Sequence, residues 1–231
     1  MSSLESLKQQ PCLSFGVIAD VQYADTEDGY NFAKTNVRYY RTALQMLNKA
    51  VKIWNEDSLK RPKFMLQLGD IIDGKNKSLG IAESSLSTVL QAMSKFAGPV
   101  YHIWGNHEFH NFGREQLLSS DLYSGNTEGS IAEPGRAYYM VTPHPALRVL
   151  ALDCYEISLL ASLTGTKEFE LASEIMKNHP NEDQNSSEGM VGTERRFVKY
   201  NGALSEEQLT WMEKNLEEAV QLRQNVVIIG M

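Results

Sequence analysis

Five polar side chains that could bind divalent cations fall into three short, widely separated motifs. Asp20 and Gln22 lie two residues apart, Asp70 follows a glycine, and Asn106 and His107 belong to a Gly-Asn-His-Glu sequence. Carboxylate, carboxamide and imidazole groups all serve as metal ligands, and a carboxylate has two oxygens with which to bridge two ions. If the fold brings the motifs together, the sequence predicts a divalent-metal site with Asp70 at its centre.

Each motif alone has an ordinary structural explanation. An isolated Asp-x-Gln carries little information, Gly-Asp at the end of a strand often forms a turn, and Asn-His-Glu can begin a helix. The combination favours metal chemistry, because all three motifs occupy the same position relative to an apolar run.

Apolar segments precede the motifs. Residues 64–69 contain four apolar residues among six, too many for a half-exposed strand, and Gly69 gives the backbone freedom to turn just before Asp70. Residues 15–22 and 100–108 have the same form. Because the carboxyl ends of parallel strands meet at one edge of a sheet, we expect the three motifs to lie together there.

Helical periodicity separates the expected strands. Apolar residues recur every three or four positions in residues 36–54 and 81–96, which gives the order strand, helix, strand, helix, strand. This alternation is typical of an α/β layer. Residues 25–36 and 74–80 are polar and contain glycine, so we expect loops there. The later patterns predict strands at residues 138–141, 147–153 and 225–230 and helices at residues 168–177 and 205–223.

The helix predicted at residues 205–223 has the clearest signature. Ser205 and Gln208 fit a capping box at its start. Apolar residues at helical spacing are expected to form its buried stripe: Leu209, Met212, Leu216, Ala219 and Leu222.

Composition indicates a globular chain of one domain, with 231 residues of which 42% are hydrophobic and 22% charged. The net charge of −7 argues against binding to nucleic acid or to an anionic membrane, both of which need clustered Lys and Arg. No segment approaches the roughly 18 to 20 consecutive apolar residues of a spanning helix, and no signal-peptide pattern is present, so we expect a cytoplasmic protein. The two cysteines, Cys12 and Cys154, are too few for a disulfide framework.

The motifs with their flanking residues resemble those of the calcineurin-like metallophosphoesterases. Within that superfamily they are most similar to the manganese-dependent ADP-ribose/CDP-alcohol diphosphatases, in residues 19–25, 66–74, 104–112 and 200–212. The resemblance implies an α/β fold of the α+β sandwich type, in which a β-sandwich is flanked by helices.

Carried over residue by residue, the resemblance implies a two-metal site. Asp20 and Gln22 would hold the first ion, Asp70 would bridge both ions and Asn106 would hold the second, while His107 would act as the catalytic group beside the leaving-group oxygen. Gln22 stands where many members have His, and its harder amide oxygen favours Mn²⁺, with Mg²⁺ as a substitute, over Zn²⁺. The implied substrates are small nucleotide diphosphates, namely ADP-ribose and CDP-alcohols, and the intact family form is expected to be a monomer.

The chain departs from the family pattern at its C-terminus. Family members continue after the strand that matches residues 225–229 with a His ligand and later a Gly-His-x-His motif, and neither occurs here. We therefore expect a flexible tail at residues 1–12 and a metallophosphoesterase domain at residues 13–231 that lacks its C-terminal part. Two alternative functions stay open: a non-catalytic truncated isoform acting as an interaction protein, and another phosphodiesterase. The remaining histidines are expected to be structural or solvent-exposed rather than replacement ligands: His102, His110, His144 and His179.

Overall fold

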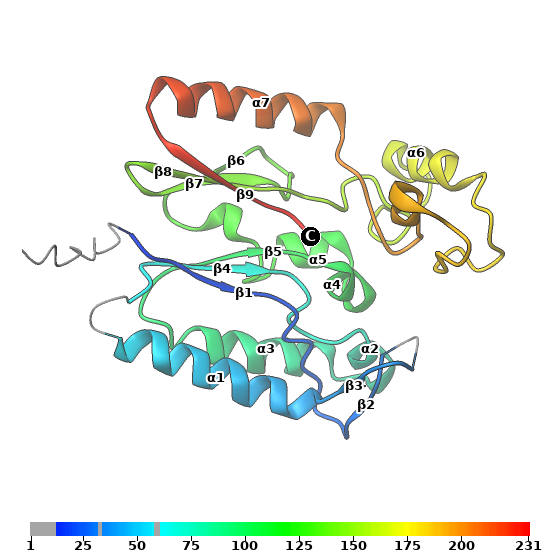
Figure 1. The fold of residues 1–231 in the computed structure, drawn as a ribbon, viewed down its shortest axis with the longest axis horizontal. Helices are drawn as coiled ribbons and strands as arrows, with labels where there is room; N and C mark the ends of the chain where they lie inside the picture. The colour runs from blue at the N-terminus through cyan, green and yellow to red at the C-terminus, as the bar shows by residue number, and fades with distance from the viewer. Residues whose placement is uncertain (1–12, 32–33, 58–60) are drawn as a thin grey trace, which may run out of the picture.

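Two β-sheets pack face to face between two layers of helices (Figure 1). The computed structural model describes residues 13–31, 34–57 and 61–231, so the tail predicted at residues 1–12 lies outside the described residues. The layers confirm the predicted α/β class of sandwich type. None of the helices in these described ranges is long and apolar enough to cross a membrane.

The sheet that carries the motifs has three parallel strands in the order β1 (Gly16–Ile18), β4 (Met65–Leu68) and β5 (Val100–Ile103). Successive side chains of a strand point to opposite faces, and accordingly Met65 joins the core under the helices while Leu66 joins the core between the sheets. Both faces of β4 are therefore buried, which explains its nearly continuous apolar sequence. The prediction that the three motif-bearing strands end at one edge is confirmed.

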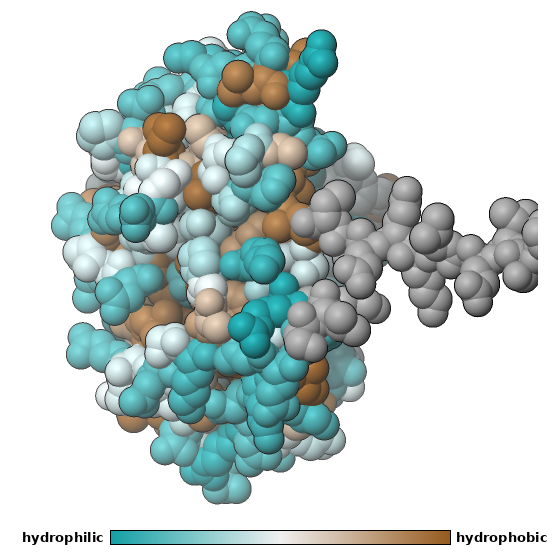
Figure 2. Space-filling model, turned by 90° about the vertical axis from the view of Figure 1, so that its left-hand side faces the viewer, coloured by the Kyte–Doolittle hydropathy of each residue, from teal (hydrophilic) through white to brown (hydrophobic). Residues whose placement is uncertain are grey.

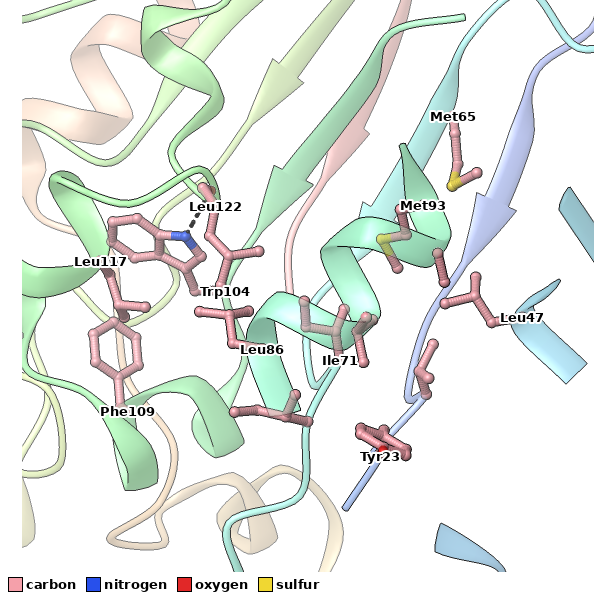
Figure 3. Packing of buried hydrophobic residues seen from close by; sticks show 14 of the residues in the cluster. Tyr23, Leu47, Met65, Ile71, Leu86, Met93, Trp104, Phe109, Leu117 and Leu122 are labelled. Atoms are coloured by element: carbon pink, nitrogen blue, oxygen red, sulfur yellow. Dashed lines mark hydrogen bonds between the residues drawn. The ribbon is translucent and has the colours of Figure 1, made fainter. Parts of the chain in front are cut away.

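The helices α1 (Tyr40–Glu56) and α3 (Ala82–Met93) cover the outer face of this sheet (Figure 1). Figure 3 shows how their apolar stripes meet the sheet, with Leu47 and Met93 among the buried side chains. At the far end of the same core, the indole of Trp104 donates a hydrogen bond of 2.9 Å to a main-chain carbonyl.

The second sheet has four strands in the order β6 (Ser130–Ala132), β7 (Tyr139–His144), β8 (Leu147–Ala151) and β9 (Asn225–Ile229). β6, β7 and β8 are antiparallel neighbours, and β9 pairs with β8 in parallel. The strands predicted at residues 138–141, 147–153 and 225–230 are thus present. The core between the sheets contains side chains from both of them: Leu66, Tyr101, Ile103, Tyr139, Val141, Val149 and Ala151.

Two segments predicted to be loops contain regular structure. The strands β2 (Gly29–Tyr30) and β3 (Val37–Arg38) form a short hairpin, and as a result α1 begins at Tyr40 rather than near residue 36. Residues Lys75–Leu79 form the helical turn α2, which ends at Gly80 in a left-handed conformation with φ of 69°. A buried asparagine within α2 stabilises this turn through hydrogen bonds to two carbonyls outside it, a contact that the local sequence does not reveal.

The remaining elements are short and irregularly spaced. The helix α6 (Lys167–Met176) coincides closely with the helix predicted at residues 168–177. Besides α6, the short elements are α4 (Asn106–Asn111), α5 (Arg114–Leu118) and the 3₁₀ turns at Ser124–Asn126 and Gly192–Arg196.

The edge of the molecule at which the parallel strands begin is hydrophilic, with apolar residues scattered across it (Figure 2).

The helix α7 (Glu206–Gln221) covers the second sheet, but its buried face differs from the predicted apolar stripe (Figure 1). Leu209 and Leu222 are exposed, whereas Gln208 and Asn215 are buried. Gln208 does not complete the predicted capping box, because its side chain instead bonds the backbone at the end of β8. Ser205 does cap the helix, since its hydroxyl accepts the Gln208 N–H at 3.0 Å.

Candidate metal centre

The backbone turns sharply at the carboxyl ends of β1 and β4. Three residues other than glycine adopt left-handed conformations there: Asp20 with φ of 54°, Gln22 with φ of 45° and Asp70 with φ of 53°. Such conformations cost on the order of 1–3 kcal/mol each and concentrate at functional sites. All three are predicted site residues, so the strain falls on the side chains that the sequence singled out.

Two glycines allow the ends of β4 and β5 to approach each other. A Cβ on Gly69, which has φ of 91°, would lie 2.7 Å from the backbone nitrogen of Gly105. A Cβ on Gly105 would lie only 2.2 Å from Oδ1 of Asp70. The motifs that begin at Gly69 and Gly105 therefore need glycine at both positions to bring Asp70 beside the third motif.

The predicted residues of the first two motifs are in contact. The side-chain amide of Gln22 donates to Oδ1 of Asp20 at 3.2 Å and to Oδ2 of Asp70 at 3.3 Å. The backbone N–H of Gln22 also bonds the carbonyl of Asp70 at 2.9 Å, which continues the pairing of the two strands beyond their ends. The NH₂ group of Gln22 thus lies between the two carboxylates, and the side-chain amide would have to turn over for its oxygen to share an ion with Asp20 and Asp70.

The third motif joins this group through His107. Its backbone N–H donates to Oδ1 of Asp70 at 2.9 Å, and its Nε2 lies 3.9 Å from Oδ2 of the same carboxylate. Its Nδ1 accepts the backbone N–H of Gly74 at 2.6 Å. Burial lowers the pKa of His107, which favours the neutral imidazole. Because Nδ1 accepts a hydrogen bond, the single ring proton resides on Nε2, the nitrogen that faces Asp70.

Sequence reasoning missed an arginine beside this histidine. Arg38, on β3, forms an ion pair with Oδ2 of Asp73, and that oxygen lies 3.7 Å from Nδ1 of His107. No local signal identified Arg38, because the sequence pattern placed it in the helix predicted at residues 36–54, whereas it lies on β3. The pair neutralises the second aspartate of the Gly-Asp-x-x-Asp motif.

The role of Glu108 was also missed, although the residue was part of a recognised motif. Its side chain is buried and accepts backbone N–H groups from Asp70 at 2.7 Å, Ile71 at 2.9 Å and Gly105 at 2.7 Å. Burial and the charge of Asp70 raise the pKa of Glu108 to about 8, against the opposing effect of these donors. Glu108 thereby joins the end of β4 to the start of α4, where Asn106 lies.

The donor set suits a hard divalent cation. Asp20 and Asp70 supply carboxylates, while Gln22 and Asn106 supply amide oxygens, which are the ligand types preferred by Mn²⁺ and Mg²⁺. Within the described ranges no group of three or more His, Cys, Asp and Glu residues is placed to hold a metal ion. Two of the four candidate ligands here are amides, which do not belong to that set. Burial and the charge of Asp20 raise the pKa of Asp70 to about 6, a cost that a bound cation would reverse. The residues present therefore fit a metal.

The sandwich fold and the motifs at its strand ends are typical of metal-dependent phosphoesterases. Comparison with known protein families leads to the same class. Residues 13–142 match the calcineurin-like phosphoesterase family, and the chain belongs to that family. It is also similar along nearly its whole length to proteins named manganese-dependent ADP-ribose/CDP-alcohol diphosphatase.

The mouse relative is 41% identical over 229 residues, covering 96% of this chain and 66% of the relative. The human relative is 41% identical, covering 94% of this chain and 65% of its own length. The rice relative is 40% identical, and the match covers 97% of this chain and 67% of the relative. A crystal structure of a dimetal phosphatase from Danio rerio superposes with a TM-score of 0.88 at 37% identity, covering 95% of this chain and 69% of that one. The chain thus spans about two thirds of the length of these relatives.

Proposed function

We propose that this protein is a Mn²⁺-dependent hydrolase that cleaves the pyrophosphate bond of ADP-ribose and of CDP-alcohols such as CDP-choline, CDP-ethanolamine and CDP-glycerol. The products are a nucleoside monophosphate and ribose phosphate or a phospho-alcohol. The observation that carries the proposal is the chain of contacts from Asp20 through Gln22 and Asp70 to His107, which unites three motifs in one place. The names of relatives that are about 40% identical support the substrate class.

Four side chains would hold the metal ions. Asp20 and Gln22 would bind the first ion, Asp70 would bridge both and Asn106 would bind the second. When bound, two divalent cations would supply positive charge that polarises the phosphoryl group and activates water for in-line attack. The hydrogen bond from the His107 backbone fixes the orientation of the Asp70 carboxylate before any ion arrives.

His107 is suited to assist the leaving group. The oxygen that departs from the cleaved bond gains negative charge, and a nearby N–H group stabilises or protonates it. Gly74 keeps Nδ1 occupied as an acceptor, so the Nε2–H group is available on the side of Asp70. The ion pair between Arg38 and Asp73 removes a competing carboxylate charge beside the ring.

A paired activity and binding experiment tests this function. The purified chain, given Mn²⁺ and ADP-ribose or CDP-choline, should release AMP or CMP together with the phosphorylated partner. Asp70→Asn should lower turnover by at least about 100-fold, because an isosteric amide lacks the charge needed to bridge two cations. Asp121→Asn, at an exposed aspartate, is the matched control and should retain activity.

Two results would contradict the proposal. One is full activity of Asp70→Asn, which would place the chemistry elsewhere. The other is a folded wild-type chain that cleaves neither substrate. Hydrolysis of a simple phosphodiester such as bis(p-nitrophenyl) phosphate in that second case would identify a different phosphodiesterase, and no hydrolysis at all would favour the non-catalytic form.

A further inference from the structure

His110 lies one helical turn after the proposed metal ligand Asn106. Both residues belong to α4, and residues four positions apart face the same side of a helix. The side-chain amide of Asn106 donates from Nδ2 to Nε2 of His110 at 3.4 Å. His110 is exposed to solvent as a whole residue, so this contact is made at the open side of the site.

The ring of His110 is held in place by its neighbours. It packs edge-on against the ring of His107, with ring centroids 5.7 Å apart and planes at 87°. Both histidines cover Gly74, where a Cβ would lie 3.2 Å from Cβ of His110 and 3.3 Å from Nδ1 of His107. The absence of a side chain at Gly74 therefore gives the two imidazoles room to lie side by side.

The contact decides which atom of the Asn106 amide is available to a cation. An amide has one acceptor oxygen and one donor NH₂ group, and only the oxygen binds Mn²⁺. When Nδ2 is bound to His110, Oδ1 is free to face an ion. Partners that orient a ligand in this way typically contribute about 10- to 100-fold to metal affinity.

We propose that His110 is a positioning residue that accepts a hydrogen bond from Asn106 and so turns the amide oxygen of Asn106 toward the second metal ion. This role rests on the proposed function, since it assumes that Asn106 is a ligand. It requires the neutral ring of His110 to carry its proton on Nδ1, the opposite arrangement from His107. His110 itself does not bind the ion, because the NH₂ group of Asn106 is directed at its Nε2.

Metal titration of three variants tests the proposal. Calorimetry with Mn²⁺ should show about 10- to 100-fold weaker binding for His110→Phe, which keeps a planar ring without an acceptor. His110→Gln should bind within about threefold of wild type, because its amide oxygen can accept the same N–H bond. His144→Phe, at a histidine in the second sheet whose Nδ1 bonds a backbone N–H, is the control and should bind as wild type. Wild-type affinity in His110→Phe would overturn the proposal.

Spectroscopy separates positioning from direct ligation. Electron spin echo measurements on the bound Mn²⁺ should be the same for wild type and His110→Gln. A nitrogen coupling that is present in wild type and absent in His110→Gln would show that His110 binds the ion, which overturns the positioning role.

A readout without metal keeps this inference separate from the proposed function. Side-chain ¹⁵N spectra at alkaline pH should show His110 as the Nδ1–H tautomer and His107 as the Nε2–H tautomer. An Nε2–H tautomer at His110 would overturn the inference even if the chain binds Mn²⁺ and hydrolyses ADP-ribose. Conversely, the expected tautomer in a chain that neither binds Mn²⁺ nor cleaves substrate would refute the proposed function, while agreeing with a ring of His110 that accepts the N–H group of Asn106.

Discussion

The carboxylate of Glu108 accepts the backbone N–H of Asp70 at 2.7 Å, although the two residues are 38 positions apart in the sequence. The same carboxylate binds the N–H groups of Ile71 and Gly105, so one buried side chain fixes the relative position of two motifs. The geometry of the candidate metal centre therefore depends on a residue that is itself not a candidate ligand.

Replacing Glu108 by glutamine should harm both stability and metal binding. Above pH 8, where the carboxyl group of Glu108 with its pKa of about 8 is ionised, the amide keeps the size of the side chain but replaces one acceptor oxygen by an NH₂ group that faces backbone N–H donors. A buried donor left without a partner costs about 1–3 kcal/mol, so the free energy of unfolding should fall by at least that amount. Urea unfolding and Mn²⁺ calorimetry measure the two effects. The exposed Glu115→Gln change is the control, and equal behaviour of the two variants would contradict the role given to Glu108.

Substituting alanine for Gly105 should displace the Asp70 carboxylate. The added Cβ would meet Oδ1 of Asp70 at 2.2 Å, so one of the two must move, and overpacking of this kind typically costs about 1–3 kcal/mol. Mn²⁺ affinity should fall by about tenfold or more, because Asp70 loses its orientation. Gly113→Ala provides the matched control, since the nearest atom would be 3.6 Å from its Cβ. Unchanged Mn²⁺ affinity in Gly105→Ala would mean that Asp70 is not a ligand.

The sequence was sufficient to predict which strands converge. Asp20, Gln22 and Asp70 follow apolar runs, and the rule that parallel strands end at one edge places such residues together without any knowledge of side-chain contacts. The turns that expose them were foreseeable only at Gly69, because nothing in the types of Asp20 or Gln22 requires a left-handed backbone. That conformation is imposed by pairing between strand ends, which is a tertiary effect.

Partners that are distant in sequence were not predictable in the same way. The apolar spacing of α7 predicted a buried leucine stripe, yet the helix buries Gln208 and Asn215 because their partners lie on and after β8. Periodicity records hydrophobicity but cannot recognise a polar side chain whose partner is more than 50 residues away in the chain. Arg38 was missed for the same reason, since only the fold shows that it meets Asp73.

Removing Arg148 should destabilise the packing of α7 on the second sheet. This arginine on β8 is 3% exposed and donates to the carbonyl of Asn215 at 3.1 Å, to Oδ1 of Asn215 at 2.9 Å and to Gln224 at 3.0 Å. Arg148→Met fills the space but leaves these acceptors without a donor, and should lower the free energy of unfolding by about 2–4 kcal/mol. Arg195→Met, at an exposed position, should change the unfolding midpoint little. Similar midpoints for the two variants would refute the buried network.

The stability of the fold should fall in mild acid because of His102. This histidine lies on β5 with Nδ1 at 3.1 Å from Oε1 of Gln67, and burial lowers its pKa to about 4. The pKa of this histidine is near 6.5 in the unfolded chain. At a pH between 6.5 and 4, His102 therefore binds a proton in the unfolded chain but not in the folded chain. The contribution of neutral His102 to the free energy of unfolding is therefore fully present above pH 6.5. It is lost progressively as the pH falls toward 4, and the total loss is about 3 kcal/mol.

A variant isolates this contribution from those of the other titrating groups. His102→Gln cannot ionise, so its free energy of unfolding should decline less steeply between pH 6.5 and pH 4.5 than that of the wild type. Urea unfolding at several pH values in this range measures the difference between the two slopes. His102→Gln will be less stable than wild type at neutral pH if the histidine packs well, and this offset does not affect the comparison of slopes. Parallel curves would show that His102 is protonated equally in the folded and unfolded states, contrary to its position in the core.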